Sequence, residues 1–280
     1  MIGAIIGDIA GSVYEFGGVK TKDFPLFGDY RGEKCRFTDD SAMTLAAAGA
    51  LLEAAEEGGE LSACAVRWMQ KVGRRYPNAG YGGSFIRWLF AEKPKPYRSF
   101  GNGAAMRVSP AAWAAGSLEE ALRLSDAVTA VTHDHPEGMK GARAVAACVY
   151  LARTGADKAA IRDHVRQYYY PLEKTLEEIR PGYRFEVSCR KSVPEAIQAF
   201  LEGESFEDAI RNAISLGGDS DTQAAIAGSI AGPYFGIPES LRQRALDFLP
   251  ASLRAILGEF ETRFGADPLP GAAGIQNGTA

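Results

Sequence analysis

The sequence predicts an all-α protein. Most of the chain is rich in strong helix formers or shows helical periodicity, and few stretches alternate apolar and polar residues as a strand does. Ser117 with Glu120, and Ser192 with Glu195, have the capping-box spacing that marks a helix start. These observations favour a fold built almost wholly from helices.

The predicted helices follow one another along the chain. Small residues at positions 3, 7 and 11 predict a buried first helix, because they let it approach a neighbour closely. A helix from Asp40 ends at Gly58, a typical residue after a helix C-terminus. A helix over residues 61–73 follows, and then one over 83–91 that Pro94 and Pro96 end. The later predicted helices cover residues 137–153, 157–169, 171–180, 206–215, 221–232, 239–248 and 250–263.

The chain shows no internal division. No linker, low-complexity run or repeat interrupts it, so we expect a single compact domain over residues 1–266. Residues 267–280 have little apolar content and are predicted to form a flexible C-terminal tail. The 280 residues are 46% hydrophobic and 24% charged, as in ordinary globular proteins, so a sizeable core can form.

Charge and targeting signals limit the expected partners. A formal net charge of −4 does not favour nucleic acid. The apolar N-terminus lacks the basic region of a signal peptide, and no run reaches the ~20 apolar residues of a membrane span, so we expect a cytoplasmic protein with no membrane partner. The oligomeric state stays open. Four cysteines without CxxC spacing are predicted to be buried, reduced thiols: Cys35, Cys64, Cys148 and Cys189.

Two short acidic segments are the main candidates for chemistry. Residues 37–41 read Phe-Thr-Asp-Asp-Ser, residues 217–222 read Gly-Gly-Asp-Ser-Asp-Thr, and each opens a predicted helix. Acidic residues at a helix start often cap backbone N–H groups and need no metal. Two such segments of similar composition, one preceded by paired glycines, favour a site for hard cations such as Mg²⁺ or Mn²⁺. The oxygen donors would be Thr38, Asp39, Asp40, Asp219, Asp221 and Thr222.

Three further segments have both a functional and a structural interpretation. The Gly-Asn-Gly run at 101–103 either binds an anion through backbone N–H groups or forms an ordinary turn. His133 either contacts a ligand or faces solvent ahead of a helix capped by Asp134. Glu15, at the end of the first predicted helix, is either solvated or presented to a cleft.

Together these segments resemble the ADP-ribosylglycohydrolase family. The matching motifs are Gly-Asp-x-x-Gly-Ser-x-Tyr-Glu near the start, Thr-Asp-Asp, Gly-Asn-Gly-x-x-Met-Arg, Thr-His, Ser-Val-Pro-x-Ala-Ile and Ser-Leu-Gly-Gly-Asp-Ser-Asp-Thr, in order from Gly3 to about Pro238. The resemblance implies a compact orthogonal bundle of helices with two Mg²⁺ ions, or Mn²⁺, at the base of a cleft. It also implies an enzyme that removes ADP-ribose from a modified protein or small molecule.

The resemblance also implies roles for particular residues. The six oxygen donors would be the metal ligands, and the backbone of residues 99–102 would receive the diphosphate. His133 would line the adenosine side of the groove. A carboxylate would assist proton transfer, with the choice between Glu15 and the aspartates of the metal site left open. The catalytic candidates are Glu15, Asp39, Asp40 and Asp221, and the substrate-binding candidates are Ser99, Phe100, Gly101, Asn102, Gly103 and His133.

One departure from the family bears on the linkage that is cleaved. Arginine-directed bacterial members resembling the dinitrogenase reductase-activating glycohydrolase have an additional cleft aspartate, whereas this chain has no aspartate between Asp40 and Asp126. With Glu15 present, the pattern mildly favours O-linked ADP-ribose over arginine. Two alternatives are a two-metal phosphatase or nucleotide pyrophosphohydrolase and a non-enzymatic ADP-ribose-binding or crystallin-like protein.

Overall fold

The computed structural model describes residues 1–265, and within them the chain is almost wholly helical. The predicted tail over 267–280 lies outside the described residues. The helices are α1 (Ile2–Gly11), α2 (Asp39–Glu57), α3 (Leu61–Arg75), α4 (Gly83–Phe90), α5 (Ser109–Ala114), α6 (Leu118–Thr129), α7 (Pro136–Arg153), α8 (Lys158–Tyr168), α9 (Leu176–Ile179), α10 (Cys189–Glu202), α11 (Phe206–Ile214), α12 (Ser220–Phe235), α13 (Glu239–Phe248) and α14 (Ala251–Phe264). A 3-10 turn η1 (Asn102–Ala104) and a hairpin of β1 (Asp29–Tyr30) and β2 (Glu33–Lys34) complete the elements.

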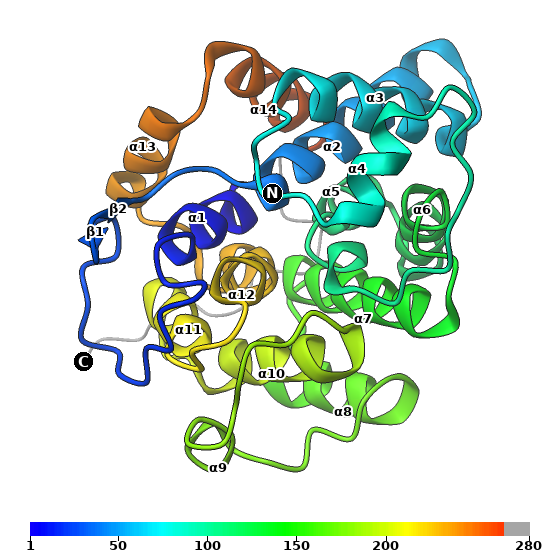
Figure 1. The fold of residues 1–280 in the computed structure, drawn as a ribbon. Coiled ribbons are helices and arrows are strands. Elements are labelled where there is room, and N and C mark those ends of the chain that lie inside the picture. Colours follow the sequence, from blue (N-terminus) through cyan, green and yellow to red (C-terminus); the bar gives the residue numbers. More distant parts are fainter. Residues whose placement is uncertain (266–280) are drawn as a thin grey trace.

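The bundle is organised around α1 and α12, which lie side by side at its centre (Figure 1). Every residue of α1 is buried. A Cβ built on Gly7 would lie 2.0 Å from the carbonyl oxygen of Ala224, so only glycine permits this approach. The prediction of a closely packed first helix is confirmed. Residue numbers rise along α1 as they fall along α12, so the helices are antiparallel, and the facing pairs are Gly3 with Gly228, Gly7 with Ala224 and Gly11 with Ser220.

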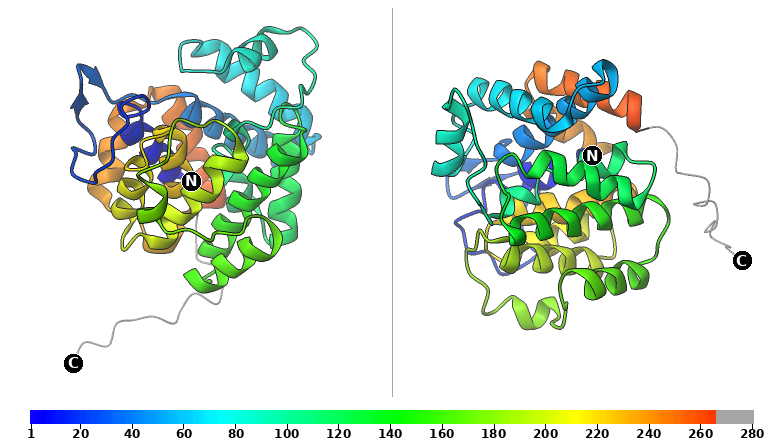
Figure 2. Two further views of the ribbon diagram at one scale, coloured as in Figure 1. Left: turned by 60° about the horizontal axis from the view of Figure 1, so that its bottom comes forward. Right: turned by 90° about the vertical axis from the view of Figure 1, so that its right-hand side faces the viewer.

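The other helices surround this pair (Figure 2). On one side α2 contacts α1 and is itself covered by α3 and α14, while α10 and α11 pack against α12 on another. Helices α5, α6 and α7 form a further contacting group, which joins the central pair through α7 and α12. The prediction of an all-α bundle is confirmed. No helix of the described chain is long and apolar enough to cross a membrane.

Two local helix predictions were wrong. The segment 171–180 forms only the single turn α9, because Pro171 has no N–H to donate and Leu172 has a positive φ of 48°. Ser192 does not begin a helix. It lies inside α10, and its hydroxyl donates to the carbonyl of Ser188 at 2.7 Å.

A tertiary contact explains the earlier start of α10. The N–H of Cys189 donates to the carbonyl of Phe100 at 2.9 Å, and the N–H of Asn102 donates to the carbonyl of Val187 at 2.7 Å. These bonds pair the segment before α10 with the segment before η1, so the helix begins directly after the pairing.

The first predicted capping box, at the start of α6, is half formed. Ser117 accepts from the N–H of Glu120 at 3.1 Å, as predicted, whereas the Glu120 carboxylate accepts from the N–H of Gly116 and not from that of Ser117.

Candidate active site

Three helix ends meet at one cavity of about 420 Å³. The antiparallel packing of α1 on α12 brings the C-terminal end of α1 to the N-terminal end of α12, and the N-terminal end of α2 lies beside both. Segments 79–85, 97–107 and 185–187 supply the remaining walls. The predicted residues that line the cavity are Glu15, Thr38, Asp39, Asp40, Ser99, Gly101, Asn102, Gly103, His133, Asp219, Asp221 and Thr222.

Asp8 joins α1 to α2 beside Asp40 and Asp221, two of the residues that line this cavity. Its carboxylate is fully buried and accepts from the N–H and the hydroxyl of Thr38, at 2.9 and 2.6 Å. It also accepts from the N–H of Ser41 at 3.1 Å and from the hydroxyl of Ser41. The candidate residues predicted from the sequence did not include Asp8. A signal was present, because Asp8 is the sole charged residue within a wholly buried helix and buried charges require compensation.

The acidic side chains form two overlapping groups. Carboxylate oxygens of Asp8, Asp40 and Asp221 lie within 4.8 Å of one another, as do those of Glu15, Asp219 and Asp221. The hydroxyl of Thr222 donates to Oδ2 of Asp40 at 3.1 Å, which ties the start of α12 to the start of α2. Asp221 therefore belongs to both groups and lies between them.

This cluster fits a cation. Burial, and then repulsion from neighbouring carboxylates, raises the pKa values of Asp39, Asp40 and Asp221 well above the ordinary range. Oδ1 of Asp40 is buried and has no hydrogen-bond partner among the described residues. Oxygen-only donors and uncompensated negative charge are what Mg²⁺ and Mn²⁺ sites provide. The cluster therefore could bind metal.

Glu15 lies at the cavity and not in open solvent. Burial, and then the charge of Asp221, raises the pKa of Glu15 to about 8. The next residue, Phe16, is 78% exposed, and its ring lies 5.1 Å from that of Phe185. Of the two placements open from the sequence, the structure shows the carboxylate presented to a cleft.

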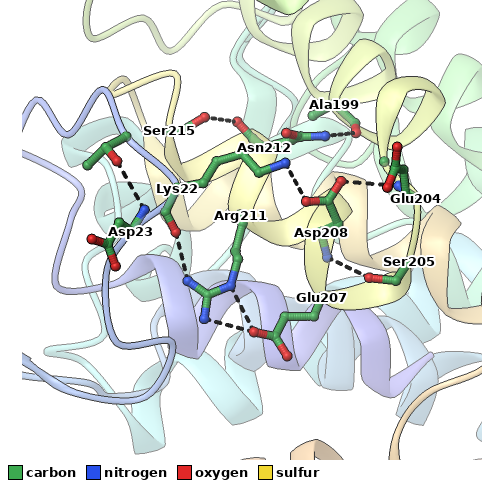
Figure 3. A network of polar contacts seen from close by, with 12 residues as sticks. Lys22, Asp23, Ala199, Glu204, Ser205, Glu207, Asp208, Arg211, Asn212 and Ser215 are labelled. Atoms are coloured by element: carbon green, nitrogen blue, oxygen red, sulfur yellow. Dashed lines mark hydrogen bonds and ion pairs between the residues drawn. The ribbon is translucent and has the colours of Figure 1, made fainter.

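The loop after Glu15 is held in place by hydrogen bonds and ion pairs to other segments of the protein. Lys20 donates to the carbonyls of Tyr183, at 2.8 Å, and Leu216, at 2.5 Å. Farther along, Arg211 on α11 donates to the carbonyl of Lys22 at 2.9 Å (Figure 3). It also donates to the carbonyl of Phe24 at 2.7 Å. Lys22 in turn pairs with Asp208, and Glu207 pairs with Arg211 (Figure 3). These contacts fix the polypeptide on which Glu15 is carried.

Paired glycines allow the start of α12 to approach that loop. Gly217 has a φ of 66°, and a Cβ there would lie 2.6 Å from the carbonyl oxygen of Val19. A Cβ on Gly218 would lie 2.4 Å from the ring of Tyr183. Any residue with a side chain would obstruct the packing at these two positions, so glycine is required at both.

The Ser99–Gly103 loop lines the cavity, but part of its backbone is already hydrogen-bonded within the protein. The N–H of Gly101 donates to the hydroxyl of Ser99 at 3.2 Å, and the N–H of Asn102 donates to Val187. The side chain of Asn102 donates to Oδ2 of Asp219 at 2.7 Å and so orients a cluster carboxylate. The side chain of Phe100 does not line the cavity: the residue is 52% exposed and its ring packs on His135, so only its backbone stays a predicted part of the site.

His133 faces the cavity and contacts Arg107, which was not among the predicted site residues. Burial, followed by the charge of Arg107, lowers the pKa of His133 well below its usual value. The interpretation in which the His133 imidazole faces solvent is therefore wrong. Capping of α7 by Asp134 is wrong as well, because His135 accepts from the N–H of Glu137 whereas Asp134 accepts from the N–H of Arg98.

Fold and site together define an all-α protein with a carboxylate-lined cavity, and comparison with known proteins assigns its family. The ADP-ribosylglycohydrolase family model matches residues 1–267, so the chain belongs to the ADP-ribosylglycohydrolase family. It is accordingly a hydrolase that acts on ADP-ribose adducts.

Several curated proteins are similar over most of the chain. ADP-ribosylhydrolase ARH3 of Mus musculus is 28% identical, with 92% of this chain and 91% of the mouse protein covered. ADP-ribosylhydrolase ARH3 of Homo sapiens is 28% identical over 87% of both chains. ADP-ribosylarginine hydrolase Tri1 of Pseudomonas putida is 27% identical, covering 85% of this chain and 70% of that protein.

A solved structure supports the fold. An ADP-ribosylglycohydrolase-related protein complex matches with a TM-score of 0.68 at 24% identity, covering 93% of this chain and 95% of that chain. At this identity the similarity establishes the helical architecture alone.

Proposed function

We propose that the protein hydrolyses the N- or O-glycosidic bond between ADP-ribose and a modified target, using two Mg²⁺ ions, or Mn²⁺, at the carboxylate cluster. The observation that carries this proposal is the place of Asp221 in two overlapping carboxylate groups, within 4.8 Å of Asp40 in one and within 4.8 Å of Asp219 in the other. Two overlapping groups suit two adjacent cation positions. The proposed metal ligands are Thr38, Asp39, Asp40, Asp219, Asp221 and Thr222.

Asp8 supports the ligands instead of joining them. Its two oxygens accept four hydrogen bonds from Thr38 and Ser41, so their lone pairs are largely used. Asp40, in contrast, retains one buried oxygen without a partner among the described residues. Bound cations would supply Lewis-acid polarisation of the sugar hydroxyls and of the attacking water.

The protein's own residues would position the substrate and move the proton. The Ser99–Gly103 loop, His133 and Glu15 line the same cavity, so one bound ligand can contact all of them. The acid or base is one of Glu15, Asp39, Asp40 and Asp221, all of which line the cavity.

We further propose that O-linked ADP-ribose is preferred over the arginine adduct. The carboxylates that line the cavity, within the part of the chain that the structure describes, are Glu15, Asp39, Asp40, Asp219 and Asp221, all of them at the cluster. A guanidinium leaving group favours a carboxylate partner for its fork of N–H donors. The cavity wall formed by residues 79–85, between α2 and the Ser99–Gly103 loop, supplies no such carboxylate.

The test offers three substrates: an ADP-ribosyl-serine peptide, O-acetyl-ADP-ribose and an ADP-ribosyl-arginine peptide, each with Mg²⁺ or with EDTA. Mass spectrometry follows release of free ADP-ribose. We expect metal-dependent release, fastest from an O-linked substrate. Asp219→Asn should reduce the rate by at least about 100-fold, whereas Asp157→Asn at the exposed start of α8 should not change it.

The products separate the competing possibilities. Release of AMP instead of ADP-ribose would indicate a pyrophosphohydrolase and overturn the proposed bond. Equal release of ADP-ribose with EDTA and with Mg²⁺ would overturn the proposed role of the cations. Faster release from the arginine peptide would overturn only the linkage preference.

A further inference from the structure

Arg107 is a fully buried cation that contacts no carboxylate among the described residues. It is 1% exposed, and burial lowers its pKa to about 10. Its Nη2 lies 2.5 Å from the hydroxyl oxygen of Thr132 and 3.2 Å from Nδ1 of His133. Burial of a guanidinium is costly, so the partners that it does have indicate a specific role.

The chemistry of these partners determines which ring nitrogen of His133 carries hydrogen. A guanidinium has five N–H donors and no acceptor, so Nδ1 of His133 must accept from Arg107. The Thr132 oxygen also accepts from Arg107, so its own hydrogen donates to the same Nδ1 at 2.7 Å in preference to the Thr129 carbonyl at 3.5 Å. Two donors therefore meet at Nδ1, and the imidazole hydrogen is left on Nε2.

Nε2 faces the loop that lines the cavity. A Cβ built on Gly103 would lie 3.4 Å from Nε2, and one built on Gly101 would lie 3.7 Å away. Among the described residues none accepts a hydrogen bond from this nitrogen. An N–H is therefore presented to the cavity beside two residues that have no side chain to obstruct a ligand.

We propose that Arg107 is a positioning residue which holds His133 as the neutral Nε2–H tautomer, so that His133 donates a hydrogen bond to an acceptor oxygen of the bound ligand. The ligand's identity as an ADP-ribose adduct rests on the proposed function, whereas the tautomer does not. The same guanidinium disfavours a second proton on the ring, because an imidazolium would place two positive charges in contact. The arrangement yields a donor of fixed direction and no net charge.

Nitrogen NMR on protein with ¹⁵N-labelled histidine tests the tautomer directly. The chain has three histidines, His133, His135 and His164, so the spectrum is sparse. His133→Gln assigns the signal. We expect the wild-type His133 to be a single Nε2–H tautomer at neutral pH, and a signal from the Nδ1–H tautomer or from imidazolium would overturn the proposal.

Variants separate Arg107 from its neighbour. Arg107→Met should give a mixture of tautomers, because the Thr132 oxygen could then accept from Nδ1–H. Arg107→Lys, which keeps a donor-only cation, should restore Nε2–H at least in part. Thr132→Val should retain the Nε2–H tautomer, since Arg107 still donates to Nδ1. A mixture of tautomers in Thr132→Val would show that the Thr132 hydroxyl positions His133, and it would overturn the positioning role of Arg107. The wild type and Thr132→Val decide the question even if Arg107→Met does not fold.

Binding supplies a second readout. Calorimetry with ADP-ribose should show a Kd raised about fivefold in Arg107→Met, as expected for loss of one aligned hydrogen bond. With a hydrolysed substrate, KM should rise by a similar factor while kcat stays within about twofold. Thr129→Val is the matched control, because it removes a buried hydroxyl, three residues from Thr132, that has no hydrogen-bond partner within residues 1–265. An equal loss of affinity in Thr129→Val would indicate general disturbance and overturn the proposed positioning role.

Discussion

Asp8 and Thr38, thirty residues apart in the chain, are joined by two hydrogen bonds, from the Thr38 N–H at 2.9 Å and from its hydroxyl at 2.6 Å. Thr38 is also the N-cap of α2 and accepts from the N–H of Asp40. Through Thr38, the middle of α1 therefore sets the direction in which the Asp39 and Asp40 carboxylates leave their helix. The carboxylate cluster therefore depends on a residue outside the proposed set of metal ligands.

Asp8→Asn should destabilise the protein. An amide offers one acceptor oxygen and adds two donors, so at least one of the four hydrogen bonds from Thr38 and Ser41 is lost or becomes a clash. We expect a loss of about 2–4 kcal/mol in the free energy of unfolding, measured by urea titration. Asp157→Asn is the control, because Asn also caps a helix start. An Asp8→Asn protein as stable as the wild type would contradict the supporting role of Asp8.

Gly7→Ala should be among the most damaging single changes. Its Cβ would lie 2.0 Å from the carbonyl oxygen of Ala224, which forces α1 and α12 apart, at a cost of about 3 kcal/mol or more in unfolding free energy. Gly258→Ala in α14 is the matched control. Nothing lies within 4 Å of a Cβ there, so alanine should stabilise by up to about 1 kcal/mol through helix propensity. Thermal melts of the two variants should move in opposite directions.

Asp221→Asn should separate stability from cation binding. In EDTA the variant should be more stable than the wild type, because one member of a repelling carboxylate group is removed. Wild-type protein should gain about 2.7 kcal/mol when Mg²⁺ reaches about 100 times its Kd, and the variant should gain much less. Calorimetric melts with and without Mg²⁺ measure both effects. An equal gain in stability from Mg²⁺ in both proteins would show that the cation binds away from Asp221.

His133 should make stability fall on acidification. Its pKa in the folded protein lies well below the ordinary 6.5, so the unfolded chain takes up the proton first. The resulting penalty is absent above about pH 6.5 and grows below it by up to about 1.4 kcal/mol per pH unit. Urea titrations between about pH 5 and pH 8 should show a shallower acid decline in His133→Gln than in wild type. Thr129→Val, which adds no titrating group, should retain the wild-type decline; identical slopes in His133→Gln and wild type would contradict the prediction.

The sequence by itself determined most of the helices and the oxygen donors of the candidate cation site. Alanine-rich periodicity, the glycines at 3, 7 and 11 and the two acidic segments depend on local spacing, which the chain displays directly. The same applies to the oxygen-only donor set, because hard-cation preference follows from residue type. Family resemblance then connected segments that are far apart in the chain.

Only the tertiary structure decided the contacts between distant segments. Asp8 meets Thr38 because α1 lies beside α2, and α10 begins at Cys189 because Phe100 accepts from its N–H. The backbone N–H of Asn102, which the family resemblance directs at the diphosphate, donates to the carbonyl of Val187 for the same reason. A hydrogen bond between remote residues depends on where each chain segment packs, and no local spacing encodes that position. Such contacts orient the candidate site, whereas the sequence specifies which side chains it can contain.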